Sequence, residues 1–292
     1  MAARLPLIAI VGPTASGKTA LAIELARKFN GEIICADSRT IYKGMDIGTA
    51  KPTMAEQAIV QHWGLDLVEP NERFTAADFK RYADQKIEEI RGRNHIPFLV
   101  GGTGLYVNSV LYNYSFQIDH DPKYRQTLEA MTIDELVYYC VKNNIKLPEN
   151  SKNKRYLVRT IETKNVFRSV NSKLINDAIV VGIATKITDD YAQRVARRAE
   201  KIISDGVVEE ATMLSEKYGW DSEAMTGNIY PLVRQYLNGS LTCVQLIERF
   251  IIADRQLAKR QMTWLKRDSH ITWLSIDEAN SYLEAVLSEH QS

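Results

Sequence analysis

The sequence has little cysteine, no long hydrophobic run and almost no net charge. Only 3 of its 292 residues are cysteine, and Cys35, Cys140 and Cys243 are too far apart for metal-ligand spacing. We therefore expect reduced thiols, as in a cytoplasmic protein. No stretch reaches the roughly 18 apolar residues that span a membrane, and the first apolar stretch lacks the layout of a signal peptide. The net charge of +1 carries no overall signature of nucleic-acid binding.

What is present is the composition of an ordinary globular protein, with 45% hydrophobic and 25% charged residues. Short apolar runs alternate with helical segments from about Leu5 to Leu111, a pattern that predicts an α/β fold with a parallel sheet flanked by helices. The expected strands are Leu7–Val11, Glu32–Asp37, Pro97–Val100, Ala178–Ala184 and Ile271–Ile276. The expected long helices are Ala20–Lys28, Asp78–Arg93, Asp189–Tyr218 and Thr242–Arg267.

The middle of the chain has a different character. From Lys123 to about Asn176 it is polar and helix-like, with turn signals at Pro148-Glu149-Asn150 and Asn171-Ser172. The sequence therefore predicts a core formed by residues 1–117 and 179–292, with a small helical insertion at 118–178.

A complete phosphate-binding loop (P-loop) follows the first strand. It reads Gly12-Pro13-Thr14-Ala15-Ser16-Gly17-Lys18-Thr19, the Gly-x-x-x-x-Gly-Lys-Thr pattern. Backbone N–H groups and a helix N-terminus converge there, with Lys18 as a fixed cation. The Thr19 hydroxyl is available to Mg²⁺. The loop predicts binding of a nucleotide or another diphosphate.

Two further polar residues follow strands that we expect to end beside this loop. Ligands of parallel sheets bind beyond the carboxyl ends of the strands, so Lys18, Asp37 and Thr103 are expected to face one cleft. Asp37 is a candidate general base, or a Mg²⁺ ligand acting through water. The alternative for Asp37 is a helix-capping or turn aspartate. Gly44–Pro52 and Gly101–Gly104 are interpreted as turns.

Basic side chains cluster on two expected helices. The clusters are Arg194, Arg197, Arg198 and Lys201 on one helix, and Lys259, Arg260, Lys266 and Arg267 on the other. Such clusters usually form solvated faces, but beside a diphosphate site they favour contact with a phosphate backbone. The opposite face of the second helix carries Leu246, Phe250, Leu257 and Trp264, which we expect to point toward a core.

Taken together, these segments resemble the tRNA dimethylallyltransferase family. The matching pieces are Gly12–Thr19, Ala36–Pro52, Phe74–Phe79, Val100–Tyr106 and Arg255–Leu265, which occur in the family's order along nearly the whole chain. The segment Ala36–Pro52 is the most specific, because few other P-loop proteins carry it.

The resemblance implies transfer of a dimethylallyl group from dimethylallyl diphosphate to N6 of the adenosine 3′-adjacent to the anticodon. Its implied partners are the tRNA anticodon loop and Mg²⁺, the latter at Thr19 through the donor diphosphate. Lys18, Asp37 and Thr103 become the expected catalytic residues, and the insertion would grip tRNA. The residues that the resemblance assigns to tRNA are Asp37, Ser38, Arg39, Thr40, Thr103 and Arg125. We expect a cytoplasmic monomer without a membrane partner.

The chain departs from the family pattern at three places. Thr212 stands where the family has an arginine on the diphosphate, a position for which Arg194 or Arg197 could substitute. Thr226–Pro231 replaces a Gln-x-Ile-Gly-Tyr-Lys segment, and Lys164–Arg168 replaces a Thr-Gly-Lys turn. Two alternatives therefore stay open: a small-molecule kinase in which Asp37 activates a hydroxyl, and a tRNA-binding relative with weakened or no catalysis.

Overall fold

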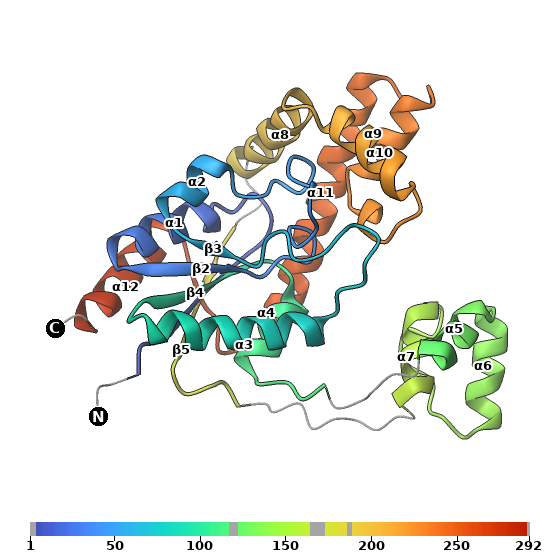
Figure 1. The fold of residues 1–292 in the computed structure, drawn as a ribbon, viewed down its shortest axis with the longest axis horizontal. Coiled ribbons are helices and arrows are strands. Elements are labelled where there is room, and N and C mark those ends of the chain that lie inside the picture. The colour runs from blue at the N-terminus through green and yellow to red at the C-terminus, as the bar shows by residue number, and fades with distance from the viewer. Residues whose placement is uncertain (1–3, 117–121, 164–172, 186–188, 291–292) are drawn as a thin grey trace. The chain divides into compact units, whose positions relative to one another are not determined.

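The computed structural model describes residues 4–116, 122–163, 173–185 and 189–290. The chain divides into two compact units, which are coloured along the sequence in Figure 1. Unit 1 comprises Met1–Asn113 and Lys173–Ser292, and unit 2 comprises Tyr114–Ser172. Each unit has its own hydrophobic core, so the two are described separately.

Unit 1 is built on a six-stranded sheet in the order β3-β2-β4-β1-β5-β6, in which every neighbouring pair is parallel. The strands are β1 (Leu7–Val11), β2 (Gly31–Cys35), β3 (His62–Trp63), β4 (Ile96–Gly101), β5 (Ala178–Ile183) and β6 (Thr272–Leu274). The predicted α/β class and its five strands are confirmed. The two-residue β3 was not predicted, because it is too short to show a pattern.

Helices cover both faces of this sheet. One face is covered by α1 (Lys18–Lys28) and α12 (Ile276–Glu289), and the other by α3 (Ala76–Gly92) and α4 (Gly104–Leu111) (Figure 1). The Phe79 and Tyr106 rings of α3 and α4 stack with centroids 4.2 Å apart. A capping box between Thr75 and Asp78 begins α3, the structural role that a Thr-x-x-Asp spacing favours.

The remaining helices of unit 1 are α2 (Met54–Ile59), α8 (Asp189–Ser204), α9 (Val207–Tyr218), α10 (Tyr230–Leu237) and α11 (Cys243–Leu265), with a 3₁₀ turn, η1, at Ala224–Thr226. The single helix predicted over Asp189–Tyr218 is wrong, since α8 and α9 are separate. Gly206 lies between them at φ +99°, a left-handed conformation that glycine adopts without strain and that ends a helix. Trp264 was expected in a core, but it is 38% exposed and Leu265 is buried instead.

Unit 2 contains α5 (Pro122–Ala130), α6 (Ile133–Lys142) and α7 (Lys154–Thr163). Its core consists of Leu128, Leu136, Cys140, Leu157, Val158 and Ile161. The predicted insertion ran from 118 to 178, whereas Lys173 to Asp177 belong to unit 1. The Ile175 N–H donates to the Leu111 carbonyl and the Leu7 N–H donates to the Asp177 carbonyl, which ties this segment to the sheet.

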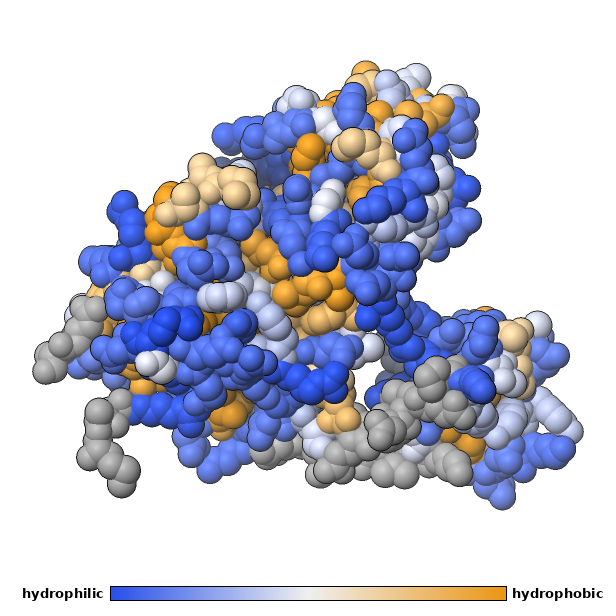
Figure 2. Space-filling model, in the orientation of Figure 1, coloured by the Kyte–Doolittle hydropathy of each residue, from blue (hydrophilic) through white to orange (hydrophobic). Residues whose placement is uncertain are grey.

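Hydrophilic side chains cover most of the face shown in Figure 2. Within the described ranges, no helix is long and apolar enough to cross a membrane.

Gly101 provides a test of how tightly the central strands approach. A Cβ at Gly101 would lie 2.1 Å from the Ala36 carbonyl oxygen, which is backbone and cannot move away without opening β2 from β4. We expect Gly101→Ala to lower the free energy of unfolding by about 3 kcal/mol through overpacking. Gly92→Ala is the control, because a Cβ there meets nothing within 4 Å. Urea unfolding followed by tryptophan fluorescence measures both, and equal midpoints for the two variants would contradict the assignment.

Candidate active site

The P-loop connects the carboxyl end of β1 to the first turn of α1. Ala15 and Gly17 have φ of 58° and 89°, so the loop bends through left-handed residues, a conformation that turns backbone N–H groups inward. The Lys18 Nζ donates to the Pro13 carbonyl oxygen at 3.0 Å. Ser16 Oγ is buried and makes no hydrogen bond with the described residues. A phosphate oxygen in this loop would supply its partner.

Lys18, Asp37 and Thr103 line one cleft of about 350 Å³ at the carboxyl ends of β1, β2 and β4. Burial lowers the pKa of Lys18, and the charge of Asp37 partly opposes this shift. Lys18 and Asp37 also line a second cavity together. The predicted convergence of the three side chains is therefore present. The other residues that line the cleft are Thr14, Ser38, Arg39, Gly48, Thr49, Arg198, Thr226, Gly227, Asn228, Tyr230, Phe250, Asp254, Leu257, Arg260 and Gln261.

Hydrogen bonds hold Asp37, Ser38 and Thr103 beside one another. Thr103 Oγ1 accepts the Ser38 N–H at 3.1 Å, and the Thr103 N–H donates to the Ala36 carbonyl at 3.3 Å. One Asp37 oxygen, Oδ1, accepts the Arg39 N–H at 2.8 Å. Asp37 therefore makes the local turn that the alternative interpretation expected, and it lines the cleft as well. The Gly101–Gly102 backbone permits this close approach, because no side chain stands between the two strand ends.

A second cavity of about 320 Å³ lies on the P-loop side of the same residues. Thr14 to Ala20 form one wall, and the buried side chains of Ile33, Cys35 and Val100 contribute an apolar part. Burial raises the pKa of the Cys35 thiol to about 12, so it remains neutral. Lys18, Asp37 and Arg198 line both cavities, so a charged head group and an apolar tail could be held at adjoining places.

Arg198, from α8, brings a further cation to the cleft, which Lys18, Arg39 and Arg260 also line. Thr212 does not line these cavities, and its hydroxyl donates to the Val208 carbonyl of its own helix. The substitutes expected for the missing arginine were Arg194 and Arg197, but they do not line the cleft either. The Arg194 Nε donates to the Ala15 carbonyl of the P-loop, so Arg194 contacts the loop without lining the cleft or the P-loop cavity. The sequence analysis had assigned Arg198 to a cluster of basic side chains and had not predicted that it lines the cleft.

Three residues that the sequence analysis missed support the site, and two of them hold the P-loop from outside. Gln261 of α11 accepts the Thr14 N–H through Oε1 at 2.8 Å. Tyr191 of α8 donates its hydroxyl to the Thr14 carbonyl at 3.3 Å. Tyr230 lies across the cleft and donates to Glu210 Oε1 at 2.9 Å. No local pattern marks these contacts, because each joins segments far apart in the sequence.

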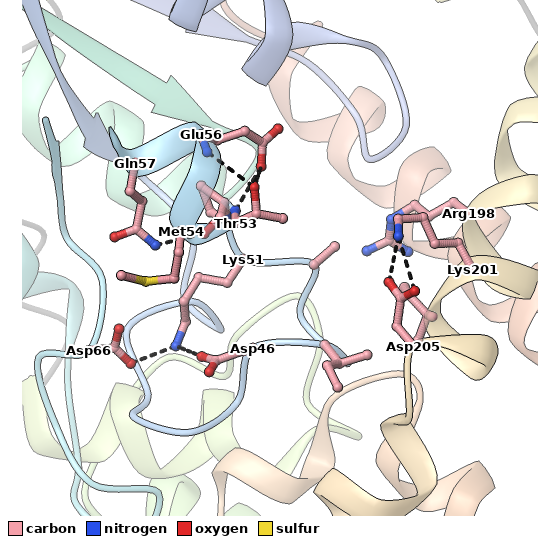
Figure 3. Close-up of a pocket in the computed structure, with 14 residues that line it drawn as sticks. Asp46, Lys51, Thr53, Met54, Glu56, Gln57, Asp66, Arg198, Lys201 and Asp205 are labelled. Carbon is pink, nitrogen blue, oxygen red and sulfur yellow. Dashed lines mark hydrogen bonds and ion pairs between the residues drawn. The ribbon is translucent and has the colours of Figure 1, made fainter. Parts of the chain in front are cut away.

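Glu210 fixes the glycine-containing segment Gly44–Pro52. Its buried carboxylate accepts the N–H groups of Asp46, Ile47 and Gly48 at 2.6 to 2.9 Å. Lys51 anchors the far end of the segment. Its ammonium lies between Asp46 and Asp66, as Figure 3 shows. The segment is thus a fixed wall of the cleft, although the sequence alone suggested only a turn.

A side cavity of about 430 Å³ opens between this wall and α8. In Figure 3, Arg198 and Lys201 of α8, together with Asp205 directly after this helix, lie opposite Lys51 and α2. Arg198 also lines the cleft and the P-loop cavity, so this residue borders all three spaces.

The other residues assigned to tRNA lie in different surroundings. Ser38 and Arg39 line the cleft, and Arg39 is held by the Glu223 and Ala224 carbonyls and by Thr226 Oγ1. Thr40 is buried beside the P-loop cavity. Arg125 belongs to unit 2, where it pairs with Glu129 and Glu162. Among the residues expected to bind a diphosphate, Thr14 to Thr19 line the P-loop cavity, and Gly12 and Pro13 connect them to β1. The expected departure at Lys164–Arg168 lies outside the described residues.

The electrostatics of Lys18 follow from its burial. Desolvation lowers the pKa of its ammonium to about 8, an effect that Asp37 opposes and Arg198 reinforces. A second cation nearby therefore makes Lys18 easier to deprotonate in the absence of an anion.

Comparison with known proteins gives a consistent result. The family model described as IPP transferase matches residues 40–268, and the model described as isopentenyl transferase matches residues 5–66. The chain is 36% identical to the tRNA dimethylallyltransferase of Streptococcus mutans over 94% of each chain. It is 33% identical to the Bacillus subtilis protein of the same name, covering 93% of this chain and 91% of that protein. The crystal structure of a Bacillus halodurans tRNA isopentenylpyrophosphate transferase has a TM-score of 0.73 at 33% identity and 98% coverage of both chains.

The low pKa of Lys18 predicts how pyrophosphate binding depends on pH. Pyrophosphate favours the charged ammonium, so its binding above pH 8 must take up a proton. We expect the affinity to fall with pH above 8, by up to about tenfold per pH unit, in metal-free buffer containing EDTA. Calorimetry in buffers of different ionisation enthalpy measures the proton uptake. Lys18→Arg is the comparison, because arginine stays charged throughout this range. An equally steep fall in that variant would contradict the role of Lys18.

Proposed function

The chain belongs to the IPP transferase family, and from this premise we propose that it alkylates N6 of the adenosine 3′-adjacent to the anticodon of tRNA. The curated relatives share one activity, so the chain is an enzyme, a prenyltransferase that acts on tRNA. The proposed donor is dimethylallyl diphosphate. The observation that supports the proposal most strongly is the meeting of Lys18, Asp37 and Thr103 in one cleft.

The cleft suits a substitution at the first carbon of the donor. An adenine amine is a weak nucleophile, because its lone pair is delocalised into the ring. In our proposal, Asp37 removes the amine proton as the new N–C bond forms and the C–O bond to the diphosphate breaks. Thr103 and Ser38, hydrogen-bonded to each other, place the reacting base. Lys18, Arg198 and the P-loop N–H groups offset the charge of the leaving diphosphate.

The residues of the P-loop cavity also fit Mg²⁺. The Thr19 hydroxyl and the Asp37 carboxylate both line it, and Mg²⁺ commonly takes one or two protein oxygens together with substrate phosphates. We therefore propose that Thr19 holds Mg²⁺ jointly with the donor diphosphate. When bound, the ion would neutralise charge on the leaving group.

The proposed tRNA contacts include the exposed face of α11. Arg255, Lys259 and Arg260 are exposed on α11, Lys266 and Arg267 are exposed directly after its last residue, and Arg260 also lines the cleft. Phosphates of the anticodon loop are the complementary ligand. The target base would have to leave its stack to enter the cleft. We further propose that the α5–α7 unit grips tRNA and that the protein acts as a cytoplasmic monomer.

The two alternatives are less well supported. The kinase requires only the P-loop and a carboxylate, whereas the full-length relatives are transferases that act on tRNA. The non-catalytic alternative rested on the missing arginine at position 212 and on the altered segment 226–231. Arg198 supplies a cation to the cleft, and Thr226, Gly227 and Asn228 of the altered segment line it.

Asp37→Asn tests the general base. The substitution keeps the shape of the side chain and removes its ability to accept the proton, so we expect kcat to fall by about 10²–10⁴-fold. The assay incubates protein, dimethylallyl diphosphate, Mg²⁺ and unmodified tRNA, and mass spectrometry of digested nucleosides quantifies N6-alkylated adenosine. Asp221→Asn is the control, because Asp221 pairs with Arg234 at the surface.

Two results would count against the proposal. If the wild type forms no alkylated adenosine but turns over ATP with a metabolite, the kinase is correct. If Asp37→Asn retains full kcat, the alkylation needs another base.

Lys266→Gln tests the α11 surface. Each lost phosphate contact should reduce the slope of log affinity against log salt by about 1. Filter binding of tRNA across a salt series measures this slope. Lys28→Gln is the control, because Lys28 pairs with Glu284 at the contact of α1 and α12. A slope equal to that of the wild type would remove Lys266 from the tRNA surface.

A further inference from the structure

Asp254 is a buried carboxylate in the wall of the cleft to which the proposed reaction assigns no role. It lies on α11 with 3% of its side chain exposed, and it lines the same cleft as Lys18 and Asp37. Its Oδ2 accepts a hydrogen bond from Nη1 of Arg198. Its Oδ1 accepts one from Nδ2 of Asn228 at 3.3 Å. Both carboxylate oxygens therefore have a partner from another segment of the chain.

Burial of this charge is costly unless it is paired. Desolvation raises the pKa of Asp254, while the Arg198 charge and the hydrogen bonds from Asn228 and Arg198 oppose the rise. A buried charge is compensated only when a partner holds it in good geometry. The ion pair therefore compensates the buried charge of Asp254 and also restrains the guanidinium of Arg198.

Arg198 needs such a restraint. Arg198 lines the cleft, the P-loop cavity and the side cavity, and its Cζ lies 5.9 Å from the centre of the Phe250 ring. Asp254 contacts it from the cleft wall. An arginine without this contact could turn toward Asp205, which lines the side cavity and not the cleft.

We propose that Asp254 is a positioning residue for the transfer reaction, which holds the Arg198 guanidinium toward the departing diphosphate, and that Asn228 holds Asp254. The inference rests on the proposed prenyl transfer. It also gives a role to one of the positions where the chain departs from the family pattern, because Asn228 lies in the Thr226–Pro231 segment. Asn228 Nδ2 additionally donates to the Ala253 carbonyl, so it is anchored to α11 itself.

Positioning and simple charge balance predict different kinetics. Negative charge develops on the diphosphate as the C–O bond breaks, and a cation already in place stabilises it without reorganisation. A released Arg198 is still attracted to the bound diphosphate. Loss of Asp254 should therefore lower kcat and leave the KM for the donor unchanged or lower.

Asp254→Asn is the first test. We expect kcat to fall by about tenfold, with no increase in the KM for dimethylallyl diphosphate. Asp221→Asn, which breaks an exposed aspartate–arginine pair, should change neither constant. An unchanged kcat would overturn the proposal. A tenfold loss of kcat/KM that comes only from a higher KM would also overturn it, because Asp254 would then affect donor binding and not the transfer step.

Combined variants test whether the residues act through one another. We expect Asn228→Ala to lower kcat by about threefold, and Asn228→Ala with Asp254→Asn to be no worse than Asp254→Asn alone. In an Arg198→Lys background, Asp254→Asn should change kcat by less than about twofold. Additive losses in either combination would show that Asp254 does not act through Arg198, and they would overturn the proposal.

A measurement without turnover separates this inference from the proposed function. Restricted rotation of a paired guanidinium gives resolved Nη–Hη signals in NMR spectra, and Arg198→Lys assigns them by their disappearance. We expect Asp254→Asn to lose these signals and Asp221→Asn to keep them when no anion is added, because pyrophosphate could itself pair with the Arg198 guanidinium. Retention in Asp254→Asn overturns the positioning role. Failure of the wild type to alkylate tRNA, with the signals behaving as expected, instead overturns the proposed function alone.

Discussion

The site depends on β4 pairing in parallel with both β1 and β2. This arrangement brings the ends of all three strands to one edge of the sheet, so the P-loop, Asp37 and Thr103 meet although 91 residues separate Gly12 from Thr103. The approach is close enough that a Cβ at Gly101 would overlap the Ala36 carbonyl. Thr103 can then hydrogen-bond the backbone that carries Asp37 and Ser38. The absence of a side chain at Gly101 thus lets the strand end that carries the proposed base lie close to the strand end beside the P-loop.

Opposite charges share the cleft that this pairing creates. Lys18 and Arg198 lie with Asp37 and Asp254 around a space of about 350 Å³. Burial lowers the pKa of the Lys18 ammonium to about 8, and the charge of Asp37 partly offsets this effect. A diphosphate that enters the cleft brings negative charge to cations that are already in place. Such a site gives strong electrostatic stabilisation because little solvent has to reorganise.

The residues that could be predicted from the sequence are those carried by local patterns. A P-loop can be recognised from the apolar run before it and the helix after it. A strand-end residue such as Asp37 can be recognised in the same way, from a few neighbouring positions. Arg198, Gln261, Glu210 and Asp254 could not be found in this way, because each reaches the site from a helix packed against a distant segment. The same limit explains the error at Asp189–Tyr218, where helical composition continues through Gly206 while the backbone turns. Trp264 was expected in a core because its apolar side chain has helical spacing. Its ring instead packs against the backbone of Gly104, so closely that a Cβ added there would lie 2.0 Å from it.

Thr212, where the family has an arginine, shows that the position of a residue in a sequence motif does not fix where positive charge lies in the structure. A missing arginine in a family pattern suggests a missing cation, but a diphosphate responds to where positive charge lies in space and not to the helix that supplies it. In this chain α8 provides the charge through Arg198, and a buried carboxylate on α11 restrains it. Asn228, also at a departure from the pattern, contacts that carboxylate. The departures at Thr212 and Asn228 look independent in the sequence, but in the structure both concern the cation Arg198. Their effects on activity should therefore be interpreted together.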